Sequence, residues 1–169
     1  MNIALIGYRG SGKSAVGKLL AARLGMAFCD TDELIVAQAG KTIREIFAAG
    51  GEPAFRALER DAVAQAAAQD NTVIAAGGGV VLDPANVAAL KRNAKIVWLS
   101  APAEVLYQRI TADITSQHTR PNLTASGGLE EVKRLLALRT PLYQSTADIT
   151  VDAGNQTPEQ LAWYLSQMV

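Results

Sequence analysis

The stretch from Asn2 to Ser14, NIALIGYRGSGKS, decides the fold. Its first five residues form a short apolar run typical of a buried strand, and its last eight match the P-loop pattern. The glycines of such a loop let successive backbone N–H groups point inward at a phosphate. A helical pattern follows, and the dipole of that helix adds to the anion site. The stretch therefore predicts a strand, a phosphate-binding loop and a helix that together bind a nucleoside triphosphate.

Each residue of this loop has an expected role toward the nucleotide. We expect Lys13 to reach the β- and γ-phosphates and Ser14 to ligate Mg²⁺ through its hydroxyl. The residues expected to bind ATP in this segment are Gly10, Ser11, Gly12, Lys13, Ser14 and Ala15. A P-loop alone does not identify the phosphate acceptor, because switches, motors, nucleases and metabolite kinases all contain one.

Composition excludes several classes of partner. The chain of 169 residues has a formal net charge of zero, so it has no basic field for a nucleic acid. No apolar run approaches the ~18 residues of a membrane span. Cys29 is the single cysteine and lies in an apolar run, which predicts a buried thiol. Because the first strand starts at Asn2, we expect no targeting peptide. We therefore expect a cytoplasmic protein, and a monomer.

Strand and helix patterns alternate along the whole chain. Apolar β-rich runs at 2–6, 26–29, 73–76, 96–99 and 149–151 alternate with helical patterns, which favours an α/β fold with parallel strands. The polar stretch 111–128 contains Pro121 and is too long for an ordinary connection, so we interpret it as a mobile lid. We expect one domain over 1–169.

Asp30 and Asp32 follow the second strand, where ligands of open α/β folds bind. Strand alternation should point both carboxylates the same way, so that one holds Mg²⁺ and the other accepts a hydrogen bond from an acceptor hydroxyl. The alternative is that Asp30 caps a helix beginning at Glu33, a role that Thr31 or Asp32 could also fill.

Three arginines fit ordinary structural roles, and one of them also fits a role toward the phosphate. Arg56, with Glu59 three residues later, fits an ordinary ion pair on a solvated helix face, and Arg139 fits a surface arginine with a buried stem. Arg120 lies in the lid, where it can either swing onto the γ-phosphate or remain an exposed loop residue. His118 is interpreted as a solvated lid residue, because phosphoryl transfer needs positioning more than a base.

Six short motifs stand in one order along the chain. They are Gly10-Ser-Gly-Lys-Ser14, Asp30-Thr-Asp32, Phe55-Arg56, Gly77-Gly-Gly79, Arg120-Pro121 and Leu138-Arg-Thr-Pro-Leu-Tyr143. This set resembles shikimate kinase over nearly the whole chain. The resemblance implies transfer of the γ-phosphoryl group of ATP to the 3-hydroxyl of shikimate, on the route to chorismate and the aromatic amino acids. It also implies a P-loop kinase fold, with a five-stranded parallel sheet in the order 2-3-1-4-5, flanking helices, a lid at about 111–128 and a substrate-binding helical segment at about 31–62.

The resemblance also implies a role for each matched residue. Arg56 and Arg139 would clamp the shikimate carboxylate, which suits two planar guanidinium groups. Asp32 would bind the ring hydroxyls, and it would act on the reacting hydroxyl either as a general base or only by orienting it. Asp30 and Ser14 would hold Mg²⁺, Lys13 and Arg120 would bind the transferred phosphate, and Arg109 and Gln156 would contact adenine. The backbone of Gly77, Gly78 and Gly79 would approach the substrate, where a Cβ would crowd the ring.

Small departures from the family pattern occur at Ala15, Asn122 and Gln156, and they concern nucleotide affinity and the seating of the lid. Two alternatives remain at this stage. One is a kinase for another small polyhydroxy acid, such as quinate or gluconate. The other is a nucleotide-binding switch without turnover.

Overall fold

The computed structural model describes residues 1–113 and 127–169. It contains a five-stranded sheet in the order β2-β3-β1-β4-β5, in which every neighbouring pair of strands is parallel. The strands are β1 (Asn2–Ile6), β2 (Ala27–Asp30), β3 (Thr72–Ala75), β4 (Ala94–Ser100) and β5 (Ile149–Asp152). The predicted α/β class, strand order and parallel direction are confirmed.

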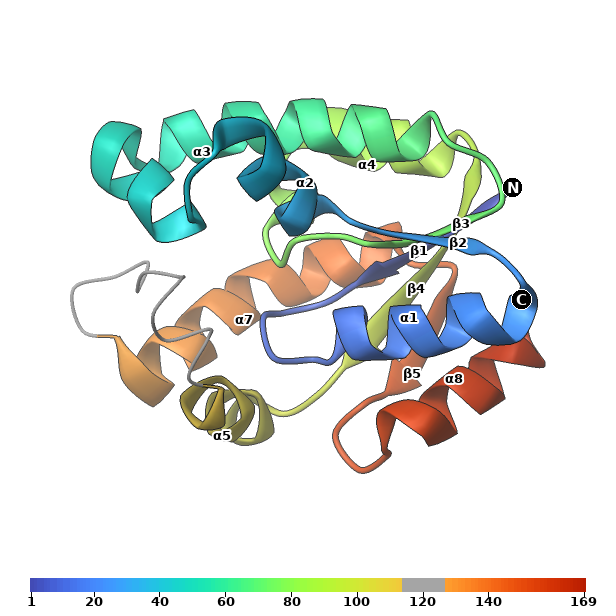
Figure 1. The fold of residues 1–169 in the computed structure, drawn as a ribbon. Helices are drawn as coiled ribbons and strands as arrows, with labels where there is room; N and C mark the ends of the chain where they lie inside the picture. Colours follow the sequence, from blue (N-terminus) through green and yellow to red (C-terminus); the bar gives the residue numbers. More distant parts are fainter. Residues whose placement is uncertain (114–126) are drawn as a thin grey trace.

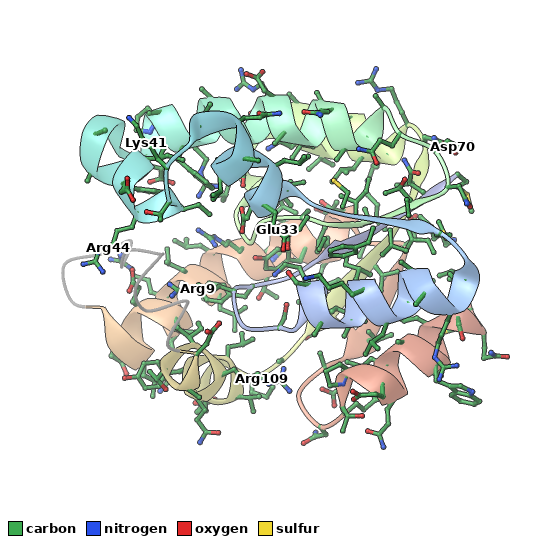
Figure 2. The ribbon with its side chains drawn as sticks, viewed as in Figure 1. Arg9, Glu33, Lys41, Arg44, Asp70 and Arg109 are labelled. Atoms are coloured by element: carbon green, nitrogen blue, oxygen red, sulfur yellow. The ribbon has the colours of Figure 1, made fainter. Side chains whose placement is uncertain are left out.

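Helices cover both faces of the sheet (Figure 1). Helices α1 (Lys13–Leu24) and α8 (Pro158–Ser166) pack on one face, and α3 (Ile43–Ala67), α4 (Pro84–Lys91) and α7 (Gly128–Thr146) pack on the other. Because all strands are parallel, the loops that follow them meet at one edge. Figure 2 shows Arg9, which follows β1, at this edge, and Asp70, which precedes β3, at the opposite one.

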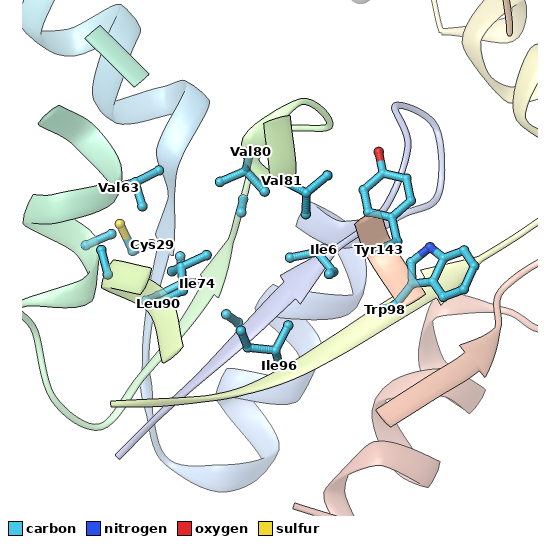
Figure 3. Close-up of a cluster of buried hydrophobic side chains, with 14 residues drawn as sticks. Ile6, Cys29, Val63, Ile74, Val80, Val81, Leu90, Ile96, Trp98 and Tyr143 are labelled. Atoms are coloured by element: carbon cyan, nitrogen blue, oxygen red, sulfur yellow. The ribbon is translucent and has the colours of Figure 1, made fainter. Parts of the chain in front are cut away.

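Strand β1 is buried on both faces, as an apolar central strand should be. Ile3 and Leu5 belong to the cluster under α1 and α8. Ala4 and Ile6 point to the other face and join the cluster shown in Figure 3, which includes Tyr143 of α7. The side-chain period of two thus builds two hydrophobic cores from one continuous apolar run.

Helix α2 (Thr31–Ala39) begins two residues before the predicted start at Glu33. The reason is its cap, because Asp30 Oδ1 accepts hydrogen bonds from the backbone N–H groups of Asp32 at 2.9 Å and Glu33 at 3.3 Å. The helix ends at Gly40, which has the left-handed conformation that is common for a glycine at a helix C-terminus.

Helix α3 is built from two halves that meet at Gly51, whose φ of 70° and ψ of −172° are not helical. The first half is capped by Thr42, whose Oγ1 accepts a hydrogen bond from Glu45 N at 3.1 Å. The second half starts near Pro53, in the first turn where proline is tolerated. The chain therefore changes direction at Gly51, and Pro53 lies near the start of the second half of α3.

The remaining described elements are the 3₁₀ turn η1 (Val80–Leu82) and helix α5 (Ala103–Ala112). Residues 114–126 lie outside the described part of the chain. The predicted lid with His118, Arg120, Pro121 and Asn122 falls mainly in that range, so the roles predicted for these residues stay predictions. Cys29 is buried and free, as predicted. None of the helices in the described ranges is long and apolar enough to cross a bilayer.

Candidate active site

Two adjoining pockets open at the carboxyl edge of the sheet. One, of about 280 Å³, lies over the P-loop, and the other, of about 380 Å³, lies between the second half of α3, the triple glycine and α7. The P-loop follows β1, Asp30 ends β2 and the triple glycine follows β3, so three neighbouring strand ends build the site. We call these the P-loop pocket and the acceptor pocket.

The P-loop has the conformation that phosphate binding requires. Gly10 and Gly12 have φ values of 87° and 94°, which other residues rarely adopt. Lys13 Nζ donates hydrogen bonds to Gly7 O at 2.8 Å and Tyr8 O at 3.0 Å. Of the residues predicted to bind ATP, those lining the P-loop pocket are Gly10, Gly12, Lys13, Ser14, Ala15 and Arg109. Ser11 is buried beneath the loop, where its hydroxyl accepts a hydrogen bond from Lys13.

The two predicted magnesium ligands lie together. Ser14 Oγ donates to Asp30 Oδ2 at 2.5 Å, while the other oxygen of Asp30 caps α2. Both interpretations of Asp30 are therefore compatible, because each uses a different carboxylate oxygen. A hydroxyl and a carboxylate beside a phosphate loop fit Mg²⁺, which takes oxygen ligands and is usually held by few protein groups.

Asp32 occupies a different local structure from the one predicted. It lies in the first turn of α2 and not on the strand, so strand alternation does not explain its direction. The helical turn nevertheless brings Asp32 to the boundary of the two pockets, and it lines both. Only 8% of its surface is exposed. The helix start, and not the strand, therefore delivers this carboxylate to the site.

The triple glycine serves close packing and not an unusual backbone, because none of the three residues is among the glycines with positive φ. A Cβ on Gly77 would lie 2.9 Å from Glu59 Oε2 and 3.0 Å from Asp32 Oδ1. A Cβ on Gly79 would lie 2.5 Å from Arg56 Nη2. The missing side chains thus make room for the carboxylates and guanidinium groups that face the pocket.

Hydrogen bonds hold this glycine segment in place. Gly77 N donates to Thr31 Oγ1 at 3.1 Å, and Gly78 O accepts from the hydroxyl of Tyr143 at 2.5 Å. Tyr143 is fully buried, and burial raises the pKa of its hydroxyl, which therefore remains a donor. Helices α2 and α7 thus fix the floor of the acceptor pocket from two sides.

The surface interpretation of Arg139 is wrong. Only 5% of this residue is exposed, and its guanidinium lies 5.5 Å from the centre of the Tyr8 ring and lines the acceptor pocket. Its Nη1 would lie 3.6 Å from a Cβ on Gly78, next to the Gly79 position that Arg56 covers. The two predicted clamp arginines therefore lie over consecutive glycines.

The solvated-face interpretation of Arg56 is also wrong, because its partner is buried. Arg56 Nη1 donates to Glu59 Oε1 at 2.8 Å, and Glu59 is only 1% exposed. Glu59 Oε2 has no hydrogen-bond partner among the residues that the structure describes. Burial raises the pKa of Glu59, and the neighbouring Arg56 opposes that shift. The sequence predicted Glu59 as an ion-pair partner of Arg56, three residues away, but not as a residue of the pocket.

The two predicted adenine contacts have different positions. Arg109 donates to Ala153 O at 2.7 Å and to Gly10 O at 3.4 Å, which brings it to the P-loop. Gln156 donates to Asp152 O at 2.8 Å and lies in a separate surface depression with Trp163. The structure therefore brings Arg109, but not Gln156, to the wall of the P-loop pocket.

Comparisons with known proteins agree with this geometry. The family model "Shikimate kinase" matches residues 9–169. Shikimate kinase from Symbiobacterium thermophilum is 48% identical over 151 residues, covering 89% of this chain and 86% of the relative. Shikimate kinase from Trichormus variabilis is 42% identical over 170 residues, covering 100% of this chain and 91% of the relative.

A solved structure shows the same fold. Shikimate kinase from Acinetobacter baumannii, determined in complex with shikimate, superposes with a TM-score of 0.92 at 33% identity, covering 99% of this chain and 91% of that one. The family match, the two relatives and this structure agree over nearly the full length of the chain. The chain therefore belongs to the shikimate kinase family.

Proposed function

We propose that this protein transfers the γ-phosphoryl group of ATP to the 3-hydroxyl of shikimate, as a step in aromatic amino acid biosynthesis. One observation carries the assignment of the acceptor: two arginines lie over consecutive glycines in a pocket that adjoins the P-loop pocket. Two guanidinium groups at one place fit a carboxylate, and the polar groups around them fit a hydroxylated ring.

The acceptor side of the proposal rests on Arg56, Arg139 and the glycine segment. The guanidinium of Arg139 is held over the ring of Tyr8, and that of Arg56 is held by Glu59, so neither has to be ordered by the substrate. A preordered pair loses less side-chain entropy when it binds a carboxylate. In this scheme Gly77, Gly78 and Gly79 form the floor against which the ring lies.

Asp32 is assigned to the reacting hydroxyl because it lines both pockets. A carboxylate at this boundary can accept the hydroxyl hydrogen bond and hold the oxygen in line with the phosphorus. It can also receive the proton as the new O–P bond forms.

The phosphate side rests on the P-loop. Lys13 donates to the loop carbonyls in this structure, and we propose that phosphate oxygens take over some of these hydrogen bonds when ATP binds. Ser14 and Asp30 would hold Mg²⁺, which when bound neutralises charge on the phosphate oxygens. Arg120 as a further phosphate contact, and Arg109 and Gln156 as adenine contacts, remain part of the proposal.

We further propose that the protein works as a single-domain monomer in the cytoplasm. Measurement of the molar mass of the purified protein in solution tests the oligomeric state.

Release of ADP by the purified protein with ATP and Mg²⁺ tests the function against a panel of shikimate, quinate and gluconate. We expect shikimate to stimulate release far more than the other two acids. Stimulation by quinate or gluconate in its place would support the alternative polyhydroxy acid kinase. Tight ATP binding without transfer to any acceptor would support a nucleotide-binding switch.

A further inference from the structure

The boundary between the two pockets is formed by few side chains. Of the residues that the structure describes, only Arg9, Asp32 and Ile110 line both pockets. Ile110 is apolar, so Arg9 and Asp32 are the charged groups shared by the two spaces. Phosphoryl transfer moves a group from the P-loop pocket to the acceptor pocket, so these two side chains line both the space that the group leaves and the space that it enters.

The backbone of Arg9 is held tightly at this position. Its amide nitrogen would lie 3.2 Å from a Cβ on Gly78, so the P-loop and the triple glycine touch here. On the other side, a Cβ on Gly10 would lie 3.1 Å from both Leu106 O and the Ile110 side chain of α5. The backbone of Arg9 and Gly10 thus lies between the glycine floor and α5. Figure 2 shows Arg9 in the loop between β1 and α1.

The charge at this boundary needs a cation. Asp32 contributes a carboxyl group here, and in the transition state negative charge spreads over the three equatorial oxygens of the phosphoryl group. A carboxylate alone would repel that charge where the phosphorus passes. A guanidinium on the same boundary offers several N–H donors and keeps its charge at every working pH.

We propose that Arg9 is a further catalytic residue, which binds the phosphoryl group while it moves from ATP to the acceptor. The inference rests on the function proposed above. The bond from the acceptor hydroxyl oxygen to the γ-phosphorus forms, and the bond from that phosphorus to the β,γ-bridging oxygen breaks. ADP keeps the electron pair of the broken bond, and Asp32 receives the hydroxyl proton. Arg9 loses no proton and acts by donating hydrogen bonds to equatorial oxygens.

The P-loop pattern gives no sign of this role. Arg9 stands at one of the four positions between Gly7 and Gly12 that the pattern leaves open, because the loop itself binds phosphate through backbone N–H groups. The spacing of residues in the sequence does not show where the acceptor pocket lies. Arg9 has its proposed function because it lines that pocket as well as the P-loop pocket.

The test compares Arg9→Met and Arg9→Lys with the wild-type protein and with Arg92→Met as a matched control. Arg92 is exposed at the end of α4 and lines neither pocket. We expect Arg9→Met to lower kcat by about 10²-fold, the usual cost of one transition-state donor. We expect the KM for shikimate, the Kd for ATP and the thermal unfolding temperature to change little. Arg9→Lys should recover part of the loss, and added guanidinium ion should partly rescue Arg9→Met.

Several outcomes would overturn the inference. A kcat of Arg9→Met equal to that of wild type would do so, and so would a rise in KM with kcat unchanged, which indicates ground-state binding alone. A lower unfolding temperature without rescue by guanidinium or by lysine would assign Arg9 a structural role. These outcomes remain distinct from failure of the proposed function, because they are scored only after the wild-type protein shows shikimate-dependent ADP release.

Discussion

Replacement of Gly79 by alanine tests the acceptor clamp with one added methyl group. Gly79 has a φ of −95° and a ψ of 10°, so alanine can adopt its backbone without strain. The new Cβ would lie 2.5 Å from Arg56 Nη2 and 2.7 Å from Arg56 Cζ. The guanidinium must therefore move away from the pocket floor by about 1 Å to restore an ordinary contact distance.

The size of the effect follows from what Arg56 loses. A charge-assisted hydrogen bond contributes about 1.5–3 kcal/mol, and a misplacement of about 1 Å is enough to forfeit it. At about 1.4 kcal/mol for each factor of ten, we expect the KM for shikimate to rise roughly 10- to 150-fold. The same shift weakens the hydrogen bond to buried Glu59, so the free energy of unfolding should fall by about 1–3 kcal/mol. The Kd for ATP should stay unchanged.

The assay is steady-state kinetics with varied shikimate, together with ATP titration and thermal unfolding. Gly25→Ala is the matched control, because Gly25 has a φ of 65° with no atom within 4 Å of its Cβ position. It should lose about 1–2 kcal/mol of stability through backbone strain and leave KM unchanged. If Gly79→Ala keeps the wild-type KM, Arg56 does not bind the acceptor from this position and the reasoning fails.

Four further substitutions test other parts of the site. Arg139→Lys should raise the KM for shikimate about tenfold or more with ATP binding intact, because a point charge cannot replace a bidentate fork; an unchanged KM removes Arg139 from the clamp. Asp32→Asn should lower kcat by about 10²–10⁴-fold in the ADP-release assay, and full activity would exclude Asp32 as base or orienting group. Asp30→Asn keeps a good helix cap while removing a charge, so the Mg²⁺ concentration for half-maximal activity should rise about tenfold without a change in unfolding temperature; an unchanged requirement contradicts the metal assignment. Burial raises the pKa of Glu59, so the folded state binds its proton more tightly than the unfolded state does. Glu59 therefore favours folding below its ordinary pKa of 4.5, and this contribution is lost as pH rises through the folded pKa. The unfolding temperature of Glu59→Gln, taken relative to that of wild type, should therefore increase as pH rises from 4.5. A difference that stays constant with pH would contradict a raised pKa at Glu59.

The fold was predictable because its signals are local. The apolar runs and the P-loop glycines each act within a few residues, and the structure confirms the parallel strands that they predict. The start of α2 was placed too late because Asp30 was weighed as a metal ligand or a cap. One of its oxygens caps the helix and the other accepts a hydrogen bond from Ser14, so the cap leaves the metal role open as a prediction.

The acceptor pocket was less predictable, because burial depends on contacts between distant segments. From spacing alone, Arg56 with Glu59 reads as a surface ion pair and Arg139 as a surface arginine. Both arginines lie in the pocket because the glycine segment leaves space for their guanidinium groups. A glycine in the sequence does not indicate which side chain will occupy the space beside it. The resemblance to a known family named the arginines but not Glu59 or Arg9.

The hydrogen bond from Tyr143 to Gly78 O has a spectroscopic consequence. The Tyr143 ring stacks on Trp98 with centres 5.6 Å apart, so a buried indole lies one residue away from the floor of the acceptor pocket. The chain has two tryptophans, and the other, Trp163, is 55% exposed on α8. A soluble quencher such as iodide can therefore suppress the emission of Trp163 and leave that of Trp98. The fold thus contains an intrinsic fluorophore through which acceptor binding can be followed without a label.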